Sequence, residues 1–241
     1  MATHTKIIDL FGLPACGKTT LAQSFCDQYG KQYSMATMHD LVKKAKTERF
    51  HLLTADPLKN ICTAMFLRFS VPFNKQRMDI PLLGWPRHAK YYAYAKKYTS
   101  YDAVIVDHGD IQDFVSLERG EDMHLFPRFV NACSRYIDVS FTDIYVYCKV
   151  ETKVAFDRMI RRIRITDRLV TTHPGRIDVI ADEKKQLAEL EAEKLRFDFY
   201  TEMLREKGCN VIEIDMCDSI DNTTKKIMEI FGKKSDKYEH N

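Results

Sequence analysis

Residues 6–29 read KIIDLFGLPACGKTTLAQSFCDQY, and this stretch changes its pattern halfway along. The run Lys6–Phe11 is mostly apolar and β-branched, which predicts a buried strand. The run Lys18–Tyr29 has apolar residues at helical spacing, which predicts an amphipathic helix. Between them, the segment from Gly12 to Thr19 fits the pattern GxxxxGK[ST]. A strand, a glycine loop and a helix in this order form the context that the pattern requires.

The glycine loop has the composition of a phosphate-binding site. Glycines let the backbone curl so that several N–H groups and the positive end of the helix face an anion. We therefore expect ATP to bind here, with Lys18 bridging its β- and γ-phosphates and the Thr19 hydroxyl binding Mg²⁺. The residues expected to contact ATP are Gly12, Ala15, Cys16, Gly17, Lys18, Thr19 and Thr20.

Cys16 lies inside this loop, close to the predicted start of the helix. A helix N-terminus lowers the pKa of a nearby thiol, and oxidation at this position could block phosphate binding. Nothing else in the sequence indicates redox control. We therefore interpret Cys16 as a passive small residue.

The rest of the chain alternates between predicted strands and segments rich in helix formers. This alternation predicts a three-layer α/β/α fold around a mainly parallel five-stranded sheet, with ligands at the carboxyl ends of the strands. The further predicted strands are Gln32–Met38, Ala103–Val106, Ile144–Cys148 and Asn210–Ile214. Helices are expected over Val154–Asp167 and Ala181–Lys207, and a last one from Asp218 or Ser219 to the residue before Gly232. We expect one domain over residues 1–232 and a disordered tail over 233–241.

Composition excludes several classes of protein. The 241 residues are 45% hydrophobic and 29% charged, which is typical of a globular protein. Seven cysteines are scattered without a Cys-x-x-Cys pair, which fits neither a disulfide framework nor a zinc site. No apolar run approaches the roughly 20 residues of a membrane span, and residues 1–9 have no secretory signal. We therefore expect a cytoplasmic protein without a membrane partner.

The net charge is only +3, but the charge is unevenly distributed. Residues 41–100 hold 12 Lys and Arg against three acidic residues, and residues 149–176 hold eight against three. Solvated surface charge would explain either zone alone. Two basic zones in one chain also suit a polyanionic ligand such as a nucleotide. We assign residues 41–100 to acceptor binding.

Two predicted strands are followed by carboxylates. The apolar run from Val104 ends in Asp107, the usual form of the second Mg²⁺-organising acid beside a phosphate loop. His108 follows it, and either orients the acceptor or caps the next turn. Asp40 comes at the end of the second predicted strand.

The predicted helix Val154–Asp167 is rich in arginine. Its apolar residues Phe156, Met159, Ile160 and Ile163 share one face, and Arg158 and Arg162 are i, i+4 neighbours on the remaining arc. A solvated face is the default interpretation. Beside a nucleotide site, guanidinium groups would instead stabilise the charge of a transferring phosphoryl group. We therefore predict that Arg158 and Arg162 act in catalysis.

The pattern Ala155-x-x-Arg158-x-x-Arg161-Arg162-x-Arg164-x-x-Asp167-Arg168 resembles the lid of thymidylate kinases. Leu82-Leu83 followed by Arg87 is loosely similar to that family's acceptor-phosphate helix. The resemblance implies a P-loop nucleotide-kinase fold, a lid over residues 154–176 and Arg87 as the acceptor contact. The chain departs from the family at Asp107-His108-Gly109, where an arginine is expected after the acid, and at Leu169-Val170, where an acidic residue is expected.

The acceptor determines which groups the site needs. A nucleoside monophosphate suits the basic segment 41–100. A neutral nucleoside would benefit from a general base, and Asp40 resembles the acidic position of deoxynucleoside kinases. Most aromatic residues of the segment 41–100 suit core packing, and Trp85 is the first candidate to stack on the base. The residues expected to bind the acceptor are Asp40, Trp85, Arg87, Asp107 and His108.

These observations predict a Mg²⁺-dependent kinase that moves the γ-phosphoryl group of ATP to a nucleoside monophosphate. Lys18, Arg158, Arg162 and Asp40 are its expected catalytic residues, and Thr19 and Asp107 its metal ligands. The alternatives are a deoxynucleoside or other small-molecule kinase, and a nucleotide-binding regulatory protein without catalysis. The expected partner is a small-molecule acceptor. A homodimer is compatible with the sequence, and a nucleic-acid partner is not expected.

Overall fold

The computed structural model describes residues 5–30, 32–47, 85–117, 142–169 and 183–233. These ranges contain one sheet of five parallel strands, in the order β2-β3-β1-β4-β5. The strands are β1 (Lys6–Phe11), β2 (Met35–Thr37), β3 (Ala103–Val106), β4 (Ile144–Lys149) and β5 (Val211–Asp215). The helices are α1 (Lys18–Tyr29), α2 (Met38–Thr47), α4 (Trp85–Tyr98), α5 (Asp110–Leu117), α7 (Thr152–Leu169), α9 (Glu183–Glu206) and α10 (Ile220–Lys233).

The predicted parallel five-stranded sheet is confirmed. The strands β1 and β3 and the helix α1 have the predicted bounds, and the other predicted elements differ by one to three residues at one or both ends. The second strand begins at Met35 rather than Gln32, and it ends at Thr37 because Met38 already begins α2. The last helix begins after Ser219, whose Oγ accepts a hydrogen bond from the N–H of Asn222 at 3.3 Å. It continues through Gly232 to Lys233, so the predicted stop before Gly232 is wrong by two residues. Residues 234–241 of the predicted tail lie outside the described residues.

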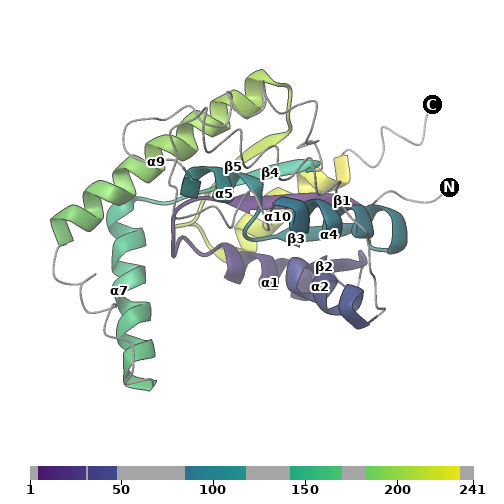
Figure 1. The fold of residues 1–241 in the computed structure, drawn as a ribbon, viewed down its shortest axis with the longest axis horizontal. Coiled ribbons are helices and arrows are strands. Elements are labelled where there is room, and N and C mark those ends of the chain that lie inside the picture. The colour runs from purple at the N-terminus through teal and green to yellow at the C-terminus, as the bar shows by residue number, and fades with distance from the viewer. Residues whose placement is uncertain (1–4, 31, 48–84, 118–141, 170–182, 234–241) are drawn as a thin grey trace.

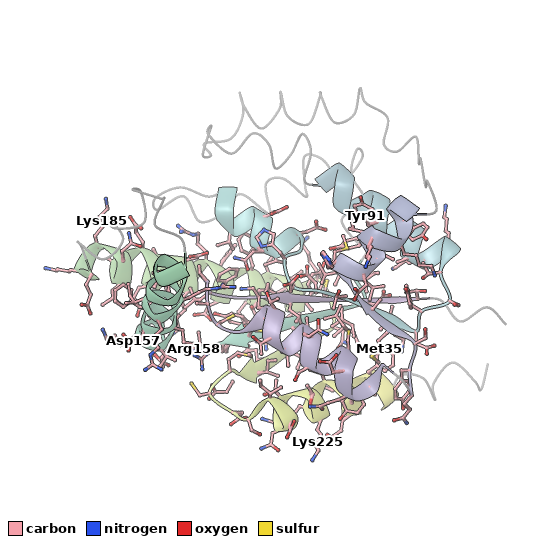
Figure 2. The ribbon with its side chains drawn as sticks, turned by 90° about the horizontal axis from the view of Figure 1, so that it is seen from below. Met35, Tyr91, Asp157, Arg158, Lys185 and Lys225 are labelled. Atoms are coloured by element: carbon pink, nitrogen blue, oxygen red, sulfur yellow. The ribbon has the colours of Figure 1, made fainter. Side chains whose placement is uncertain are left out.

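Side chains alternate along the strands and give the sheet two apolar faces. On one face, Ile7 and Val104 pack against α2 and α4, with Tyr92 fully buried among them. On the other, Ile8 and Leu10 belong to the larger core that includes Leu21 of α1 and Ile227 of α10. Figure 2 shows the yellow helix α10 below the sheet and the teal helices α4 and α5 above it. This is the three-layer α/β/α architecture that the alternation predicted.

The chain order places a crevice at the carboxyl ends of β1 and β3. From β1 the chain passes to β2 beyond β3, whereas from β3 it passes to β4 on the other side of β1. Ligands of open parallel sheets bind where the connections diverge in this way. The long helix α7 extends away from this end of the sheet (Figure 1). Within the described ranges, no helix combines the length and the apolar character needed to cross a bilayer.

Candidate active site

A cavity of about 380 Å³ lies at this edge of the sheet. Its walls come from the loop between β1 and α1, the segment after β3, and one side of α7. The lining residues are Ala15, Gly17, Lys18, Thr19, Thr20, Asp107, His108, Arg158 and Arg162. All nine are residues that the sequence analysis selected. The fold therefore brings together groups that lie more than 140 positions apart in the chain.

The backbone of the glycine loop explains why its glycines are needed. Gly12 has φ +144° and Gly17 has φ +115°, both in the region that side chains disfavour. A Cβ at Gly12 would also lie 2.5 Å from the carbonyl oxygen of Cys148 on β4. Ala15 has φ +58°, which is uncommon for a residue with a side chain. The loop therefore curls in the manner expected of an anion-binding nest.

Lys18 folds back over this loop. Its ammonium donates hydrogen bonds to the carbonyl oxygens of Gly12 at 2.8 Å and Leu13 at 3.0 Å, and lies 3.6 Å from the Cys16 sulfur. Neutral carbonyls are weaker partners than phosphate oxygens for an ammonium group. The position suits a cation that can transfer its hydrogen bonds from the loop to a bound anion.

Thr19 and Asp107 meet across the crevice. The Thr19 hydroxyl donates a hydrogen bond to Asp107 Oδ2 at 2.6 Å, although the residues are 88 positions apart. They meet because β1 and β3 are paired in parallel, so that the loop leading to α1 and the segment after β3 leave the sheet at the same edge. A hydroxyl and a carboxylate are hard oxygen ligands of the kind that Mg²⁺ uses together with substrate phosphates. No cluster of three His, Cys, Asp or Glu suited to a metal occurs in the described part of the chain.

Arg158 joins α7 to the glycine loop. Its Nη1 donates to the carbonyl oxygen of Cys16 at 2.8 Å, and its Nη2 to that of Met216 at 3.1 Å. Figure 2 shows Arg158 on the side of α7 nearer the sheet. The sequence analysis missed Met216, which follows β5 and acts through its backbone, so its residue type carries no signal. Arg162 lines the same cavity and is exposed.

The position of Arg158 depends on how α7 is attached to the protein. At the first turn of α7, the Thr152 hydroxyl donates a hydrogen bond to Glu191 of α9. The Lys153 ammonium donates to Glu183 of the same helix at 2.6 Å. These contacts hold the beginning of α7 against α9. Arg161 is exposed and is not among the lining residues. The side chains of residues 163–169, with Arg164 and Arg168, lie outside the description, and so do residues 170–176 of the predicted lid.

His108 lines the cavity beside Asp107. Its Nε2 lies 3.2 Å from Oδ1 of Asp113, which is buried in the first turn of α5. The His108 side chain is 58% exposed, so the imidazole remains accessible from the cavity. Asp113 was missed in the sequence, although its spacing of five residues from His108 places it on the helix that follows. Both interpretations of His108, as an acceptor contact or a turn residue, remain predictions.

Asp40 occupies a different environment. The Thr37 hydroxyl accepts a hydrogen bond from the N–H of Asp40 at 3.2 Å and donates to Asp40 Oδ2 at 2.7 Å. The same carboxylate accepts from the N–H of Thr37 at 3.3 Å. This is a capping box at the start of α2, which the pattern Thr-x-x-Asp would have indicated. Asp40 is exposed and does not line the cavity.

The remaining acceptor residues are only partly described. Trp85 begins α4 and Arg87 lies in its first turn, but both side chains lie outside the described residues. Residues 48–84, most of the predicted acceptor segment, lie outside them as well. The described site therefore comprises the glycine loop, the segment after β3 and one side of α7, and it contains little of the predicted acceptor segment.

Comparisons with known proteins bear on the fold. No protein-family model matches the chain, and no curated protein matches it. Among solved structures, it is similar to a deoxyadenosine kinase from M. mycoides with the products dCMP and a flexible dCDP bound. The identity is 16% over 94% of this chain and 99% of that chain, with a TM-score of 0.50. Structures of that enzyme with dCTP and with dATP, at 16% and 15% identity over the same shares, have TM-scores of 0.48 and 0.49. The first likeness confirms the predicted fold, that of a P-loop kinase.

Proposed function

We propose that this protein is an ATP-dependent phosphotransferase that moves the γ-phosphoryl group of ATP to the hydroxyl of a deoxynucleoside. The observation that carries the proposal is the cavity in which Lys18, the Thr19–Asp107 pair and Arg158 converge around a curled glycine loop. A cation, two metal-type oxygens and a guanidinium group are the parts that phosphoryl transfer uses.

Bound ATP and Mg²⁺ would supply the transferable group and neutralise its phosphates. Lys18 would turn its ammonium from the loop carbonyls to the phosphate oxygens. The oxygens of Thr19 and Asp107 would hold the metal. Arg158 and Arg162 would stabilise the charge that builds on the transferring group, because α7 directs both side chains at the cavity. Closure of the arginine-rich segment 154–176 over the site would exclude water and suppress hydrolysis.

The choice of a nucleoside rests on the charges near the acceptor side. The segment after Asp107 is His108-Gly109, without the arginine that would bind an acceptor phosphate there. The cations that line the described cavity, Lys18, Arg158 and Arg162, come from α1 and α7. Asp40 follows the carboxyl end of the neighbouring strand β2. Once its hydrogen bonds with Thr37 were broken, its carboxylate would accept the proton of the acceptor's hydroxyl group. The similar structure with a TM-score of 0.50 is named a deoxyadenosine kinase, which agrees with this acceptor class.

A nucleoside monophosphate is the second candidate acceptor. Residues 41–100 hold 12 Lys and Arg against three acidic residues, a balance that suits a phosphate dianion. In this case Arg87 would bind the acceptor phosphate, and Trp85 would stack on the base. Asp40 would then contact a sugar hydroxyl or an arginine, and no general base would be needed.

The test is a panel of acceptors incubated with ATP and Mg²⁺, with ADP and the phosphorylated product measured separately. The panel contains the deoxynucleosides, the ribonucleosides and the monophosphates of both, and the Lys18→Ala variant is the blank. We expect ADP and a deoxynucleoside 5′-monophosphate in equal amounts. Product from monophosphates alone would support the second candidate. ATP binding without transfer to any of these acceptors would overturn the proposal in favour of a regulatory nucleotide-binding protein.

A further inference from the structure

His108 and Asp113 form a polar pair on the wall of the cavity that the segment after β3 provides. The Nε2 of His108 lies 3.2 Å from Oδ1 of Asp113. The Asp113 side chain is buried, whereas the His108 side chain is exposed and lines the cavity. The pair therefore connects a buried carboxylate of α5 to the surface at which a ligand would bind.

The beginning of α5 explains why two residues five positions apart are in contact. Gly109 directly precedes Asp110, the first residue of the helix, and its carbonyl oxygen accepts the N–H of Asp113 at 3.2 Å. His108 and Asp113 thus occupy the positions N′ and N4, where two apolar side chains often pack across the first turn of a helix. Here a ring nitrogen and a carboxylate meet at these positions instead.

The turn that carries His108 also lies against the sheet. Asp9 of β1 is fully buried and is paired in register with Val106, the last residue of β3. A Cβ at Gly109 would overlap the carboxylate of Asp9, so only glycine allows the chain to lie this close to β1. The position of His108 is therefore fixed by its neighbour Gly109 and by its contact with Asp113.

A structural role by itself does not explain why the pair is polar. Two apolar side chains at N′ and N4 would fix the entry of the chain into the helix without burying a carboxylate. A carboxylate behind an accessible imidazole fixes the orientation and the tautomer of the ring, as it does where a histidine contacts a ligand. His108 shares its cavity with Lys18 and Asp107, so the ring lies beside the groups that we expect to hold ATP and Mg²⁺.

The contact with Asp113 occupies one ring nitrogen of His108 and leaves the other for a ligand. In an uncharged imidazole, a proton on Nε2 leaves a lone pair on Nδ1. This lone pair accepts a hydrogen bond from a hydroxyl group, whereas a phosphate dianion has no proton to donate and is repelled. The cavity wall at His108 therefore suits the sugar of a nucleoside better than the phosphate of a nucleotide.

We propose that Nδ1 of His108 accepts a hydrogen bond from the 3′-hydroxyl of the deoxynucleoside, and that Asp113 is the positioning residue that orients the ring. This inference rests on the proposed function and names the group that recognises the sugar of the acceptor. The reacting 5′-hydroxyl has a single proton, which the proposed reaction transfers to Asp40. The partner of Nδ1 is therefore a second hydroxyl group, and a deoxynucleoside has one at its 3′ carbon.

The experiment compares the full-length wild type with His108→Gln and His108→Asn, using a deoxynucleoside that the wild type phosphorylates and the 2′,3′-dideoxy analogue of that nucleoside. The Gln amide reaches the position of Nε2 and can still contact Asp113, whereas the Asn amide oxygen can occupy the position of Nδ1. We expect KM for the deoxynucleoside to rise about tenfold in His108→Gln and about threefold in His108→Asn, with little change in kcat. KM for ATP should not change. KM for the dideoxy analogue should be equal in the wild type and in His108→Gln, because this analogue lacks the 3′-hydroxyl.

A double-mutant cycle tests whether Asp113 acts through His108. Asp113→Asn should raise KM for the deoxynucleoside about threefold in the wild type and should have no further effect in His108→Ala. An equal effect of Asp113→Asn in both backgrounds would overturn the positioning role. If Asp113→Asn does not fold, the exposed His108 variants still decide the contact with the hydroxyl. His39→Gln on α2, which replaces an exposed histidine outside the lining of the cavity, is the control and should keep the wild-type constants.

The outcomes separate this inference from the proposed function. Equal KM values for the deoxynucleoside in the wild type and in His108→Gln would overturn the inference and leave the proposed function intact. An equal rise of KM for the deoxynucleoside and for its dideoxy analogue would also overturn it, because the contact would then be with another group. Wild-type protein that phosphorylates only monophosphates, or no acceptor, would refute the proposed function before any variant is compared.

Discussion

Asp107 and Asp40 follow neighbouring parallel strands at the same edge of the sheet, yet their carboxylates have different partners. Asp107 accepts a hydrogen bond from the hydroxyl of Thr19, which belongs to α1, and it lines the cavity together with Lys18 and Arg158. Asp40 turns back to Thr37, three residues earlier, and caps its own helix. A strand-end acid therefore acquires its role from the element that faces it. The glycine loop faces Asp107, whereas Asp40 contacts the first turn of α2.

The two carboxylates have different partners because the segments that follow their strands differ. After β3, two residues separate Asp107 from α5, which begins at Asp110, so the carboxylate projects from a turn into the crevice. After β2, the helix begins at once with Met38, so Asp40 is the third residue of a helix. At that position a carboxylate satisfies backbone N–H groups that would otherwise lack partners.

We expect the greatest loss of activity when the cation beside Asp107 is removed. Lys18→Ala removes the ammonium that the loop holds at 2.8 Å from Gly12, and should lower the initial rate of ADP formation by at least about 10³-fold. Circular dichroism should show an unchanged fold, because the Lys18 side chain is not part of the core. Lys226→Ala on α10, which removes an exposed lysine paired with Asp218, is the matched control and should keep the wild-type rate.

A slightly smaller effect is expected at Asp107 itself. Asp107→Asn keeps an oxygen that can accept the Thr19 hydrogen bond but removes the negative charge, so Mg²⁺ should bind more weakly. We expect kcat/KM to fall about 10²-fold to 10³-fold and the Mg²⁺ concentration for half-maximal rate to rise. Asp102→Asn, at the amino end of the same strand, removes a carboxylate that accepts the N–H of Ser34 at 2.9 Å. An equal loss of activity in that variant would contradict a local role for Asp107.

Arg158 reaches the same cavity from another helix, and its substitution tests whether the geometry of the guanidinium group matters in addition to its charge. Arg158→Lys keeps the charge but not the planar fork that reaches the carbonyls of Cys16 and Met216 together. The rate should fall about 10²-fold, which is less than the roughly 10³-fold to 10⁵-fold contribution of a positioned arginine, because lysine keeps the positive charge. Arg205→Lys on α9, where the fork pairs with Glu202 and Glu213, should change stability but not the rate. Full activity of Arg158→Lys would show that this position needs only a positive charge and not the planar guanidinium group.

The smallest effects are expected on the Asp40 side. Thr37→Ala and Asp40→Ala both open the capping box and should each lower the free energy of unfolding by about 1 kcal/mol, measured by urea denaturation. Asp40→Asn keeps an acceptor for the cap and removes the base. With a nucleoside acceptor it should lower kcat about tenfold, because the loose transition state asks little of a general base. Equal rates for Asp40→Asn and the wild type with a nucleoside would exclude Asp40 as the base.

Much of the fold could be predicted from local patterns. The strand Lys6–Phe11 and the helix Lys18–Tyr29 have the predicted bounds, because a short apolar run and 3.6-residue spacing are set by residues close together in the chain. The second strand was too long in the prediction by three residues at its start and by one at its end, where the cap at Thr37 begins α2. The last helix passed through Gly232, because one glycine weakens a helix by only about 1 kcal/mol and does not end it.

The residues of the site also fall into those that a local sequence pattern predicts and those that it does not. The glycine loop depends on short-range requirements of its own backbone, such as the φ of Gly12 and Gly17, and these leave a readable pattern. Met216 and Asp113 escaped notice because each contributes through its place in the fold. A backbone carbonyl and a second carboxylate have no sequence pattern that names their partners.

Local patterns were enough to predict the order of strands and helices along the chain, the curled loop before α1 and the residues that can bind phosphate. These features follow from conformational preferences of neighbouring residues. The folded chain was needed to show that Thr19 contacts Asp107, that Arg158 contacts Cys16, and that Asp40 contacts Thr37 at the start of its own helix. The parallel order of β3, β1 and β4 brings distant strand ends to one edge, and that order results from packing across the whole sheet.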